Sequence, residues 1–321
     1  MKFRLLGKSG LKVSDIGHGL WGMGAWSGSD DADSKQALRW SIEGGCNFFD
    51  SAFVYGDGKS DHLIGEVAGE FPGKNLILAS KIPPADFSWP SKPENPLHKI
   101  FPRAHVIEYA EKIKTAFGRP IDLLQFHVWE DVWAKEAEWK ETVAELKETG
   151  LIRAFGLSLN RWQPWNGLAA IETGLIDSVQ VIYNIFDQAP EDELFPACRK
   201  HNVGVIARVP LDEGSLGGKL TQDTRFPDTD WRARYFNAEN LAKTLPRIDA
   251  LKALLPEGMS LPELALRFIL SEPAVSTLIA GMRKKEHVEA NLSYSDKGAL
   301  PPALIDALRA HRWDRAQKPV V

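Results

Sequence analysis

Eight short apolar runs, each followed by a longer amphipathic stretch, constrain the fold of this chain more than any other feature. The runs are DIGHGLW, CNFFDSA, NLILASKI, IDLLQFHV, IRAFGLSL, SVQVIYNIF, VGVIARVPL and VSTLIAG. Runs rich in Val, Ile and Leu with little polar alternation are typical of parallel strands that are covered on both faces. We expect helices between and after them, at 32–45, 60–70, 104–118, 135–149, 164–173, 191–202, 239–254 and 284–293.

Eight strand–helix units predict an α/β fold, a (β/α)8 TIM barrel that forms a single domain over residues 1–321. A doubly wound sheet is the rival, but GHGLWGMG lacks the helix-opening GxGxxG register that such a sheet usually carries. Residues 2–6 and 11–15 indicate an N-terminal β-hairpin suited to plug the barrel bottom. Two long connections, 83–103 after strand three and 211–238 after strand seven, follow strand C-terminal ends, which form the active face of a barrel.

Charge and cysteine content exclude several classes of protein. The chain has 39 basic and 43 acidic residues, a balance that argues against binding to nucleic acid or to an anionic membrane surface. No apolar run approaches the roughly 20 residues of a membrane span, and MKFRLLGKSGLK lacks the apolar core of a signal peptide. Cys46 and Cys198 are too few for a disulfide framework or a cysteine-rich metal site. We therefore expect a cytoplasmic protein without a metal, whose oligomeric state the sequence does not predict.

Four polar residues stand at or just past the ends of three predicted strands: Asp50, Tyr55, Lys81 and His127. A carboxylate, a phenol, an ammonium and an imidazole can together make a proton donor matched to carbonyl reduction. A phenol with a pKa of about 10 is a slow donor at neutral pH, and a nearby ammonium lowers that pKa. A buried ammonium in turn needs a carboxylate partner. The four residues therefore indicate a catalytic site on the active face of the barrel.

Seven segments occur in an order that is highly specific in combination: RLLGKSGLKVSDIGHGLWGMG, NFFDSAFVYGDGKSDHLIGE, SKI, LLQFHVW, GLSLN, VQVIYN and GMRKKEHVEANL. Through them the chain resembles the aldo-keto reductase family over essentially its whole length. The resemblance implies a (β/α)8 barrel that binds a nicotinamide dinucleotide without a Rossmann motif. It also implies that Tyr55 is the general acid, that Lys81 tunes the pKa of Tyr55, that Asp50 is the partner of Lys81, and that neutral His127 orients the carbonyl.

The resemblance places the nicotinamide of the cofactor against three residues. Ser158 and Gln180 match positions that hydrogen-bond the carboxamide, and Arg208 stands where many members have an aromatic residue that stacks on the ring. A guanidinium can also stack on a ring, but it carries charge. Leu159 occupies the usual asparagine position, with Asn160 next to it as a candidate replacement.

The rest of the cofactor is expected near the ends of strands seven and eight. The stretch EGSLGGKL resembles the loop that clasps the pyrophosphate, and GMRKKEHVEAN resembles the segment that binds the adenosine end. The residues implied are Gly214, Ser215, Leu216, Gly281, Arg283, His287 and Asn291. The guanidinium of Arg283 can bind a 2′-phosphate bidentately, so NADP (NADPH) is the preferred cofactor. NAD stays possible, because Ala290 replaces a glutamate that contacts adenosine in many members.

The expected partner is a small carbonyl or alcohol substrate, and five aromatic residues are candidate walls of its pocket: Trp21, Phe53, Phe87, Trp89 and Trp129. Three other functions stay open. The enzyme could oxidise an alcohol or sugar, or the protein could be a slow nucleotide-binding regulatory subunit like the channel-associated members of the family. A metal-dependent barrel hydrolase would need more strand-end ligands than the one convincing histidine found here.

Overall fold

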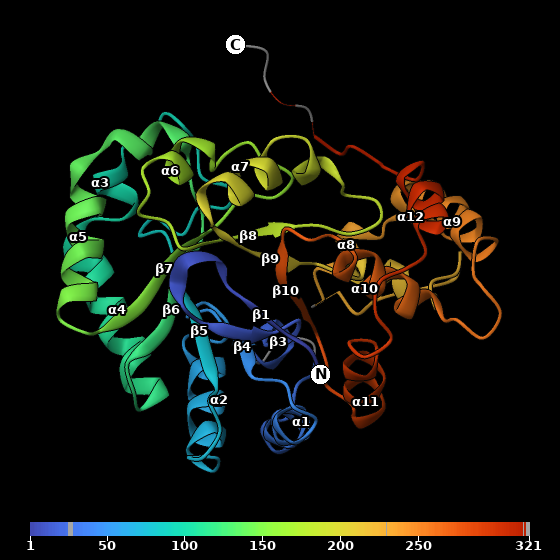
Figure 1. Cartoon of the computed structure of the whole chain (residues 1–321), viewed down its shortest axis with the longest axis horizontal. Coiled ribbons are helices and arrows are strands. Elements are labelled where there is room, and N and C mark those ends of the chain that lie inside the picture. Colours follow the sequence, from blue (N-terminus) through green and yellow to red (C-terminus); the bar gives the residue numbers. More distant parts are fainter. Residues whose placement is uncertain (25–27, 229, 317, 319–321) are drawn as a thin grey trace.

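The computed structural model describes residues 1–24, 28–228, 230–316 and 318. Eight parallel strands close into a barrel in the order β10-β3-β4-β5-β6-β7-β8-β9, and helices surround it (Figure 1). All eight predicted strands are present, so the predicted (β/α)8 barrel is confirmed. The barrel strands are β3 (Ile16–Gly19), β4 (Phe48–Asp50), β5 (Ile77–Ile82), β6 (Ile121–Phe126), β7 (Ile152–Ser158), β8 (Ser178–Ile182), β9 (Gly204–Arg208) and β10 (Val275–Ala280).

The predicted helices are all present, with ends that shift by a few residues. They are α1 (Asp31–Glu43), α2 (Lys59–Gly69), α4 (Arg103–Phe117), α5 (Ala137–Glu148), α6 (Leu168–Glu172), α7 (Leu194–His201), α9 (Ala238–Lys252) and α11 (Lys285–Ser293). Two further helices were not predicted, α10 (Leu261–Leu270) and α12 (Pro302–Arg309), and two single turns, α3 (Leu97–Ile100) and α8 (Arg232–Tyr235), lie within the long connections.

The start of α10 carries a signal that sequence reasoning missed. Ser260 caps the helix by accepting a hydrogen bond from the backbone N–H of Glu263 at 3.2 Å, and Pro262 lies in the first turn. Serine followed three residues later by glutamate is the pattern of a capping box, and proline is favoured at a helix start. The helix also has a polar side, which Glu263 and Arg267 mark at a spacing of four residues, while most of its other side chains are apolar and buried.

The N-terminal hairpin closes the bottom of the barrel. Its strands β1 (Phe3–Leu5) and β2 (Lys12–Ser14) pair antiparallel. Three hairpin side chains, Leu6, Leu11 and Val13, pack in one buried cluster with residues that point into the barrel, among them Phe48 and Leu123. This apolar plug fills the lower half of the barrel, so polar side chains farther along the same strands are confined to the upper half.

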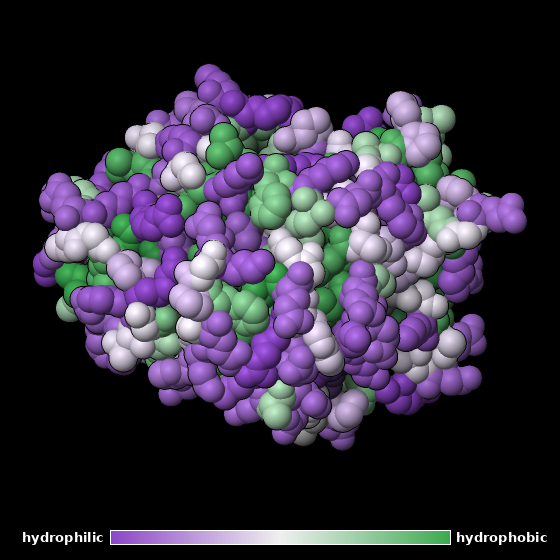
Figure 2. Space-filling view, turned by 60° about the horizontal axis from the view of Figure 1, so that its bottom comes forward, coloured by the Kyte–Doolittle hydropathy of each residue, from purple (hydrophilic) through white to green (hydrophobic). Residues whose placement is uncertain are grey.

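Hydrophilic side chains dominate the face of the molecule that Figure 2 shows, with smaller apolar patches between them. Every helix in the described part of the chain is too short or too polar to cross a membrane.

Candidate active site

Asp50, Tyr55, Lys81 and His127 meet at the C-terminal end of the barrel. Asp50 ends β4, Lys81 lies near the end of β5, Tyr55 follows β4 in a loop, and His127 follows β6 directly. Successive strand residues alternate between the interior and the helix layer. Phe48 packs in the plug, Phe49 packs among the helices, and Asp50 therefore points inward again.

Asp50 and Lys81 form a fully buried ion pair. The Lys81 Nζ lies 2.6 Å from the Asp50 carboxylate and also donates to the Ser51 carbonyl oxygen at 2.6 Å. Both side chains are nearly inaccessible, with exposures of 2% for Asp50 and 0% for Lys81. A buried cation needs such compensation, because desolvation penalises an unpaired charge heavily.

Two glutamines hold the other oxygen of the Asp50 carboxylate. Gln180 donates to Asp50 Oδ1 at 2.8 Å and Gln125 donates to it at 3.3 Å, while Gln180 also donates to Gln125 at 3.4 Å. Because a carboxylate only accepts hydrogen bonds, both amide groups must turn Nε2 toward Asp50. The Oε1 atom of Gln180 is thereby turned away from Asp50 and left as an acceptor.

Tyr55 lies between the Lys81 ammonium and the His127 ring. The Lys81 Nζ is 5.2 Å from the centroid of the Tyr55 ring, and the centroids of the Tyr55 and His127 rings are 5.9 Å apart at 76°. Burial raises the pKa of Tyr55 above its ordinary value of 10.0, and Lys81 and Arg208 oppose that rise. Burial, together with the charges of Lys81 and Arg208, lowers the pKa of His127 well below 6.5. The free protein therefore holds a neutral phenol beside a neutral imidazole at pH 7.

The predicted nicotinamide residues lie at the ends of neighbouring strands. Ser158 ends β7, Gln180 lies in β8, and Arg208 ends β9. The Arg208 guanidinium donates to the Leu159 carbonyl oxygen at 3.1 Å, and its Nε has no hydrogen-bond partner among the described residues. Leu159 itself is buried in the core, and a Cβ on Gly167 would lie 2.9 Å from its Cδ2, so its side chain faces the helix layer.

Asn160 does not take the place of the missing asparagine. Its amide donates to the Trp129 carbonyl oxygen at 3.1 Å and to Glu130 at 2.7 Å, and its oxygen accepts from Ser91 at 3.1 Å. The side chain is thus committed to the loop after β6. Asn160 is therefore not placed beside Ser158 and Gln180 as a further amide of the barrel end.

Comparison with models of known protein families shows which family this chain belongs to. The model of the aldo/keto reductase family matches residues 15–312 of the chain. The chain belongs to this family.

Relatives of this aldo/keto reductase span nearly its whole length. It is 28% identical over 301 residues to "Aldo-keto reductase YhdN" of Bacillus subtilis (strain 168), covering 90% of this chain and 87% of the relative. It is 27% identical over 311 residues to the "NADH-specific methylglyoxal reductase" of Escherichia coli (strain K12), covering 91% and 93%. The structure of the glycerol dehydrogenase AKR11B4 from Gluconobacter oxydans matches with a TM-score of 0.77 at 25% identity, covering 99% and 98%. This aldo/keto reductase is therefore an NAD(P)H-dependent oxidoreductase.

The loop after β9, residues 209–218, is here called the β9 loop. It carries Gly214, Ser215 and Leu216, of which Ser215 and Leu216 are buried, and the Ser215 hydroxyl donates to Asp212 at 2.6 Å. Gly214 has a φ of 107°, a conformation that a residue other than glycine rarely adopts. The turn thus takes its shape from a glycine and from a side-chain hydrogen bond within the loop.

The residues predicted for the adenosine end lie on and before α11. Gly281, Arg283 and His287 are exposed, whereas Asn291 is buried. A Cβ on Gly22 would lie 3.2 Å from Arg283 Cδ, which places the Arg283 side chain along the segment after β3. The end of β10 in this aldo/keto reductase is thus brought beside the end of β3, as barrel closure requires.

Three of the five predicted pocket aromatics are exposed at this end of the barrel. Trp21 follows β3 and makes an edge contact with Trp231, at 6.5 Å between ring centroids. Phe87 and Trp89 lie in the long connection after β5, and the Trp89 ring is 5.7 Å from the His127 ring. These rings are available to line a pocket above Tyr55 and His127.

Two other pocket predictions are corrected by the structure. Trp129 is fully buried and packs against Trp139, with ring centroids 5.3 Å apart, so it belongs to the hydrophobic core and not to a pocket wall. Phe53 packs against Tyr109 of α4 at 4.7 Å, on the side of the helix layer. Both follow strands closely, but sequence proximity to a catalytic residue does not determine which way a loop side chain turns.

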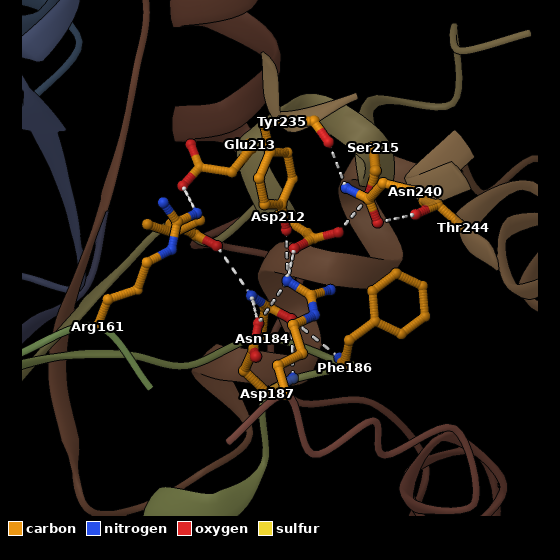
Figure 3. Close-up of polar contacts among 12 residues, drawn as sticks. Arg161, Asn184, Phe186, Asp187, Asp212, Glu213, Ser215, Tyr235, Asn240 and Thr244 are labelled. Carbon is orange, nitrogen blue, oxygen red and sulfur yellow. Dashed lines mark hydrogen bonds and ion pairs between the residues drawn. The ribbon is translucent and has the colours of Figure 1, made fainter. Parts of the chain in front are cut away.

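Several residues of the site were missed by sequence reasoning. Gln125 lies on β6 two positions before His127, which follows the strand directly, and the two-residue period of a strand could have shown that both point inward. Arg161 gave no such signal: it donates to Glu213 at 2.8 Å and lies over the ring of Trp231, whose centroid is 5.1 Å away. Figure 3 shows Arg161 and Glu213 meeting at one side of the β9 loop. No cluster of three or more possible metal ligands occurs in the described part of the chain.

Proposed function

We propose that this protein is an NADPH-dependent carbonyl reductase that reduces aldehydes or ketones to alcohols, with Tyr55 as the general acid. The observation that carries the proposal is the buried Lys81, which lies 2.6 Å from Asp50 and 5.2 Å from the centroid of the Tyr55 ring. An ion pair that only stabilises the fold does not need a phenol and an imidazole beside it at the C-terminal end of the barrel. A proton donor for carbonyl reduction needs both the nearby charge and a position that a substrate can reach.

The four side chains have separate tasks in this mechanism. The Tyr55 hydroxyl donates a proton to the carbonyl oxygen as negative charge develops there. The Lys81 ammonium stabilises the resulting phenolate, and Asp50 compensates the charge of Lys81 while the site is at rest. His127 is neutral, so it can donate a hydrogen bond to the substrate oxygen without competing as an acid. Among the described residues its Nδ1 is buried without a hydrogen-bond partner, so Nε2 is the nitrogen proposed to donate to the substrate.

The residues at the ends of β7, β8 and β9 fit a nicotinamide. Gln180 is fixed by Asp50 with its amide oxygen free, and that oxygen can accept from the carboxamide NH2 group. Ser158 adds a hydroxyl, and the partly exposed Arg208 presents a planar group that can stack on the ring. When bound, the reduced nicotinamide supplies the hydride. The protein residues supply its orientation, the proton and an environment low in water.

The preference for NADPH over NADH is proposed on the basis of Arg283. Its guanidinium is exposed just before α11, where a 2′-phosphate could be bound through two parallel hydrogen bonds. The matched test compares kcat/KM with NADPH and with NADH in the wild type and in Arg283→Ala. The variant is expected to lose most of its preference for NADPH and little of its activity with NADH. An unchanged ratio would assign the preference to other residues.

The proposed reaction is tested with a panel of aldehydes, ketones and alcohols, followed by the absorbance of reduced nicotinamide. Tyr55→Phe removes the proton donor and is expected to lower kcat by about 10²- to 10⁴-fold, the usual contribution of general acid catalysis, with little change in the Kd for NADPH. Tyr109→Phe is the control, because Tyr109 lies on α4 outside the site. Full activity of Tyr55→Phe would refute the mechanism.

Alcohol oxidation by the same residues is the second candidate. It is supported by the similarity to the glycerol dehydrogenase of Gluconobacter oxydans. In that direction the phenolate of Tyr55 would accept the proton, and Lys81 would favour it. The panel separates the two candidates by the substrate class that gives the higher kcat/KM near pH 7. Tight cofactor binding without turnover of any compound would instead favour a regulatory role.

A further inference from the structure

We propose that Arg315 is a positioning residue for the cofactor. From the segment after α12 it holds the β9 loop in the shape that binds the dinucleotide. This inference rests on the proposed function, because it takes Gly214, Ser215 and Leu216 to bind the cofactor of that reaction, as the family resemblance implies. It adds a residue that lies outside the eight strand–helix units and outside every motif of the family resemblance.

The Arg315 guanidinium is buried against acidic and hydroxyl groups from three other segments. Its Nη1 donates to Asp212 Oδ1 of the β9 loop at 2.6 Å and to the Tyr235 hydroxyl of α8 at 2.8 Å. It also lies 3.5 Å from Asp187 Oδ2 in the loop after β8. Figure 3 shows Asp187, Asp212 and Tyr235 pointing toward one place from these segments. One cation therefore joins the loop after β8, the β9 loop and α8.

The ion pair between Arg315 and Asp212 is buried away from water, so each charge needs the other for compensation. The Arg315 side chain is 7% exposed and that of Asp212 is 1% exposed. The guanidinium carbon lies 4.4 Å from the ring centroid of Trp313 and 5.6 Å from that of Trp162. In the described part of the chain, Arg315 Nε and Nη2 are buried without hydrogen-bond partners. Removal of Arg315 would leave the Asp212 carboxylate buried and unpaired, a state that proteins avoid by rearranging.

The turn that begins at Asp212 keeps its conformation only while other side chains fix it. Asp212 and Glu213 have φ values of 44° and 56°, in the left-handed region that residues other than glycine seldom adopt. Such a conformation persists only where surrounding contacts fix it. Two arginines do so, one for each acid: Arg315 binds Asp212, and Arg161 binds Glu213 at 2.8 Å.

The same contact reaches a residue proposed to bind the cofactor. Asp212 Oδ2 accepts from the Ser215 hydroxyl at 2.6 Å, while Oδ1 accepts from Arg315. Tyr235, the other acceptor of Arg315, is anchored through its carbonyl oxygen to Asn240 at the start of α9, at 2.7 Å. Arg315 is thus two hydrogen bonds away from Ser215. Its loss would release the β9 loop on the side that faces the C-terminal segment.

Arg312 provides a matched control in the same segment. It binds Asp192 through two hydrogen bonds, of 2.7 Å and 2.6 Å, on an exposed surface. In the described part of the chain, the side-chain hydrogen bonds of Arg312 go to Asp192 and Asp314 and not to the β9 loop. A purely structural role of the segment would make the loss of Arg312 and the loss of Arg315 resemble each other.

The test measures cofactor binding without turnover. The Kd and the dissociation rate of NADPH are followed by quenching of tryptophan fluorescence in the wild type, Arg315→Gln, Arg315→Lys and Arg312→Gln. We expect Arg315→Gln to weaken binding by about tenfold or more, the effect of losing a charged hydrogen bond, chiefly through faster dissociation. We expect Arg315→Lys to recover part of the loss and Arg312→Gln to stay within about twofold of wild type, the effect of a surface pair.

Several results would overturn the inference. If Arg315→Gln binds NADPH as tightly as Arg312→Gln does, Arg315 does not position the loop. If Arg315→Gln does not fold, Arg315→Lys decides. A Kd weaker than that of Arg312→Gln together with faster dissociation supports positioning, and a Kd as tight as that of Arg312→Gln overturns it. If the wild type binds neither NADPH nor NADH, the proposed function fails first and the inference fails with it.

Discussion

The loss of either member of the buried ion pair between Asp50 and Lys81 is expected to leave the other charge with neutral partners. In Asp50→Leu, the Lys81 ammonium keeps the Ser51 carbonyl oxygen at 2.6 Å and the Tyr55 hydroxyl. In Lys81→Met, the Asp50 carboxylate keeps the amide groups of Gln180 at 2.8 Å and Gln125 at 3.3 Å. Each charge is therefore left with two neutral hydrogen-bond partners.

The expected losses follow from these contacts. Removing one partner of a buried pair costs about 3–5 kcal/mol in the free energy of unfolding. Because each charge keeps two hydrogen bonds to neutral groups, we expect Asp50→Leu and Lys81→Met each to lose about 3 kcal/mol, the lower end of this range. The double variant should lose less than Asp50→Leu alone, because it leaves no buried charge.

The assay is equilibrium unfolding in urea, in which a shift of the midpoint at constant slope reports a change in stability. Arg153→Met is the control: its side chain is 51% exposed and its partner Asp122 also binds Arg119, so a loss below about 1 kcal/mol is expected. A double variant whose loss equals the sum of the two single losses would refute the reasoning.

Three further predictions concern the site and its surroundings. Gln125→Leu should release the Gln180 amide and weaken NADPH binding about tenfold, but it should not weaken the binding of 2′-phospho-ADP-ribose. The control variant Ser178→Ala, in the same barrel interior, should change the binding of neither ligand. Equal weakening of both ligands by Gln125→Leu in fluorescence titrations would contradict this prediction. Because the pKa of His127 is lowered well below 6.5 and that of Tyr55 is raised above 10.0, the kcat/KM for reduction should be flat between about pH 7 and 9, and an acid limb near 6.5 would show that His127 titrates as an ordinary histidine. Trp129→Phe should lower stability by about 1–3 kcal/mol and leave the KM for substrate unchanged, since Trp129 is fully buried; a raised KM with unchanged stability would return this residue to the pocket.

The regular part of the fold was predictable because its signal is local. Each strand needs apolar residues over a short stretch, and each of the eight runs supplied them. The hairpin and the order of elements followed in the same way. Helix α10 was missed although Ser260 and Glu263 carry a capping pattern and although Glu263 and Arg267, four positions apart, mark a polar side. Both signals are local, so the sequence contained enough to predict this helix.

In the candidate site, the residues at strand ends were predictable and several residues in loops were not. Asp50, Lys81 and His127 lie at strand ends, where alternation and parallel pairing determine which side chains share the barrel interior. Trp129 and Phe53 lie in loops, where no period applies, and the prediction that they line the pocket was wrong. The commitment of Asn160 to Glu130 depends on a loop conformation that the sequence does not specify.

By itself the sequence determined that eight strands form a barrel and that a carboxylate, an ammonium and an imidazole stand at their C-terminal ends. It could do so because strand period and strand order are encoded by neighbouring residues. Only the tertiary structure decided that Arg315 binds Asp212, 103 positions away, and that Arg161 binds Glu213, 52 positions away. These pairs join loops whose paths depend on the packing of the whole barrel, and no short-range pattern relates the two members of either pair.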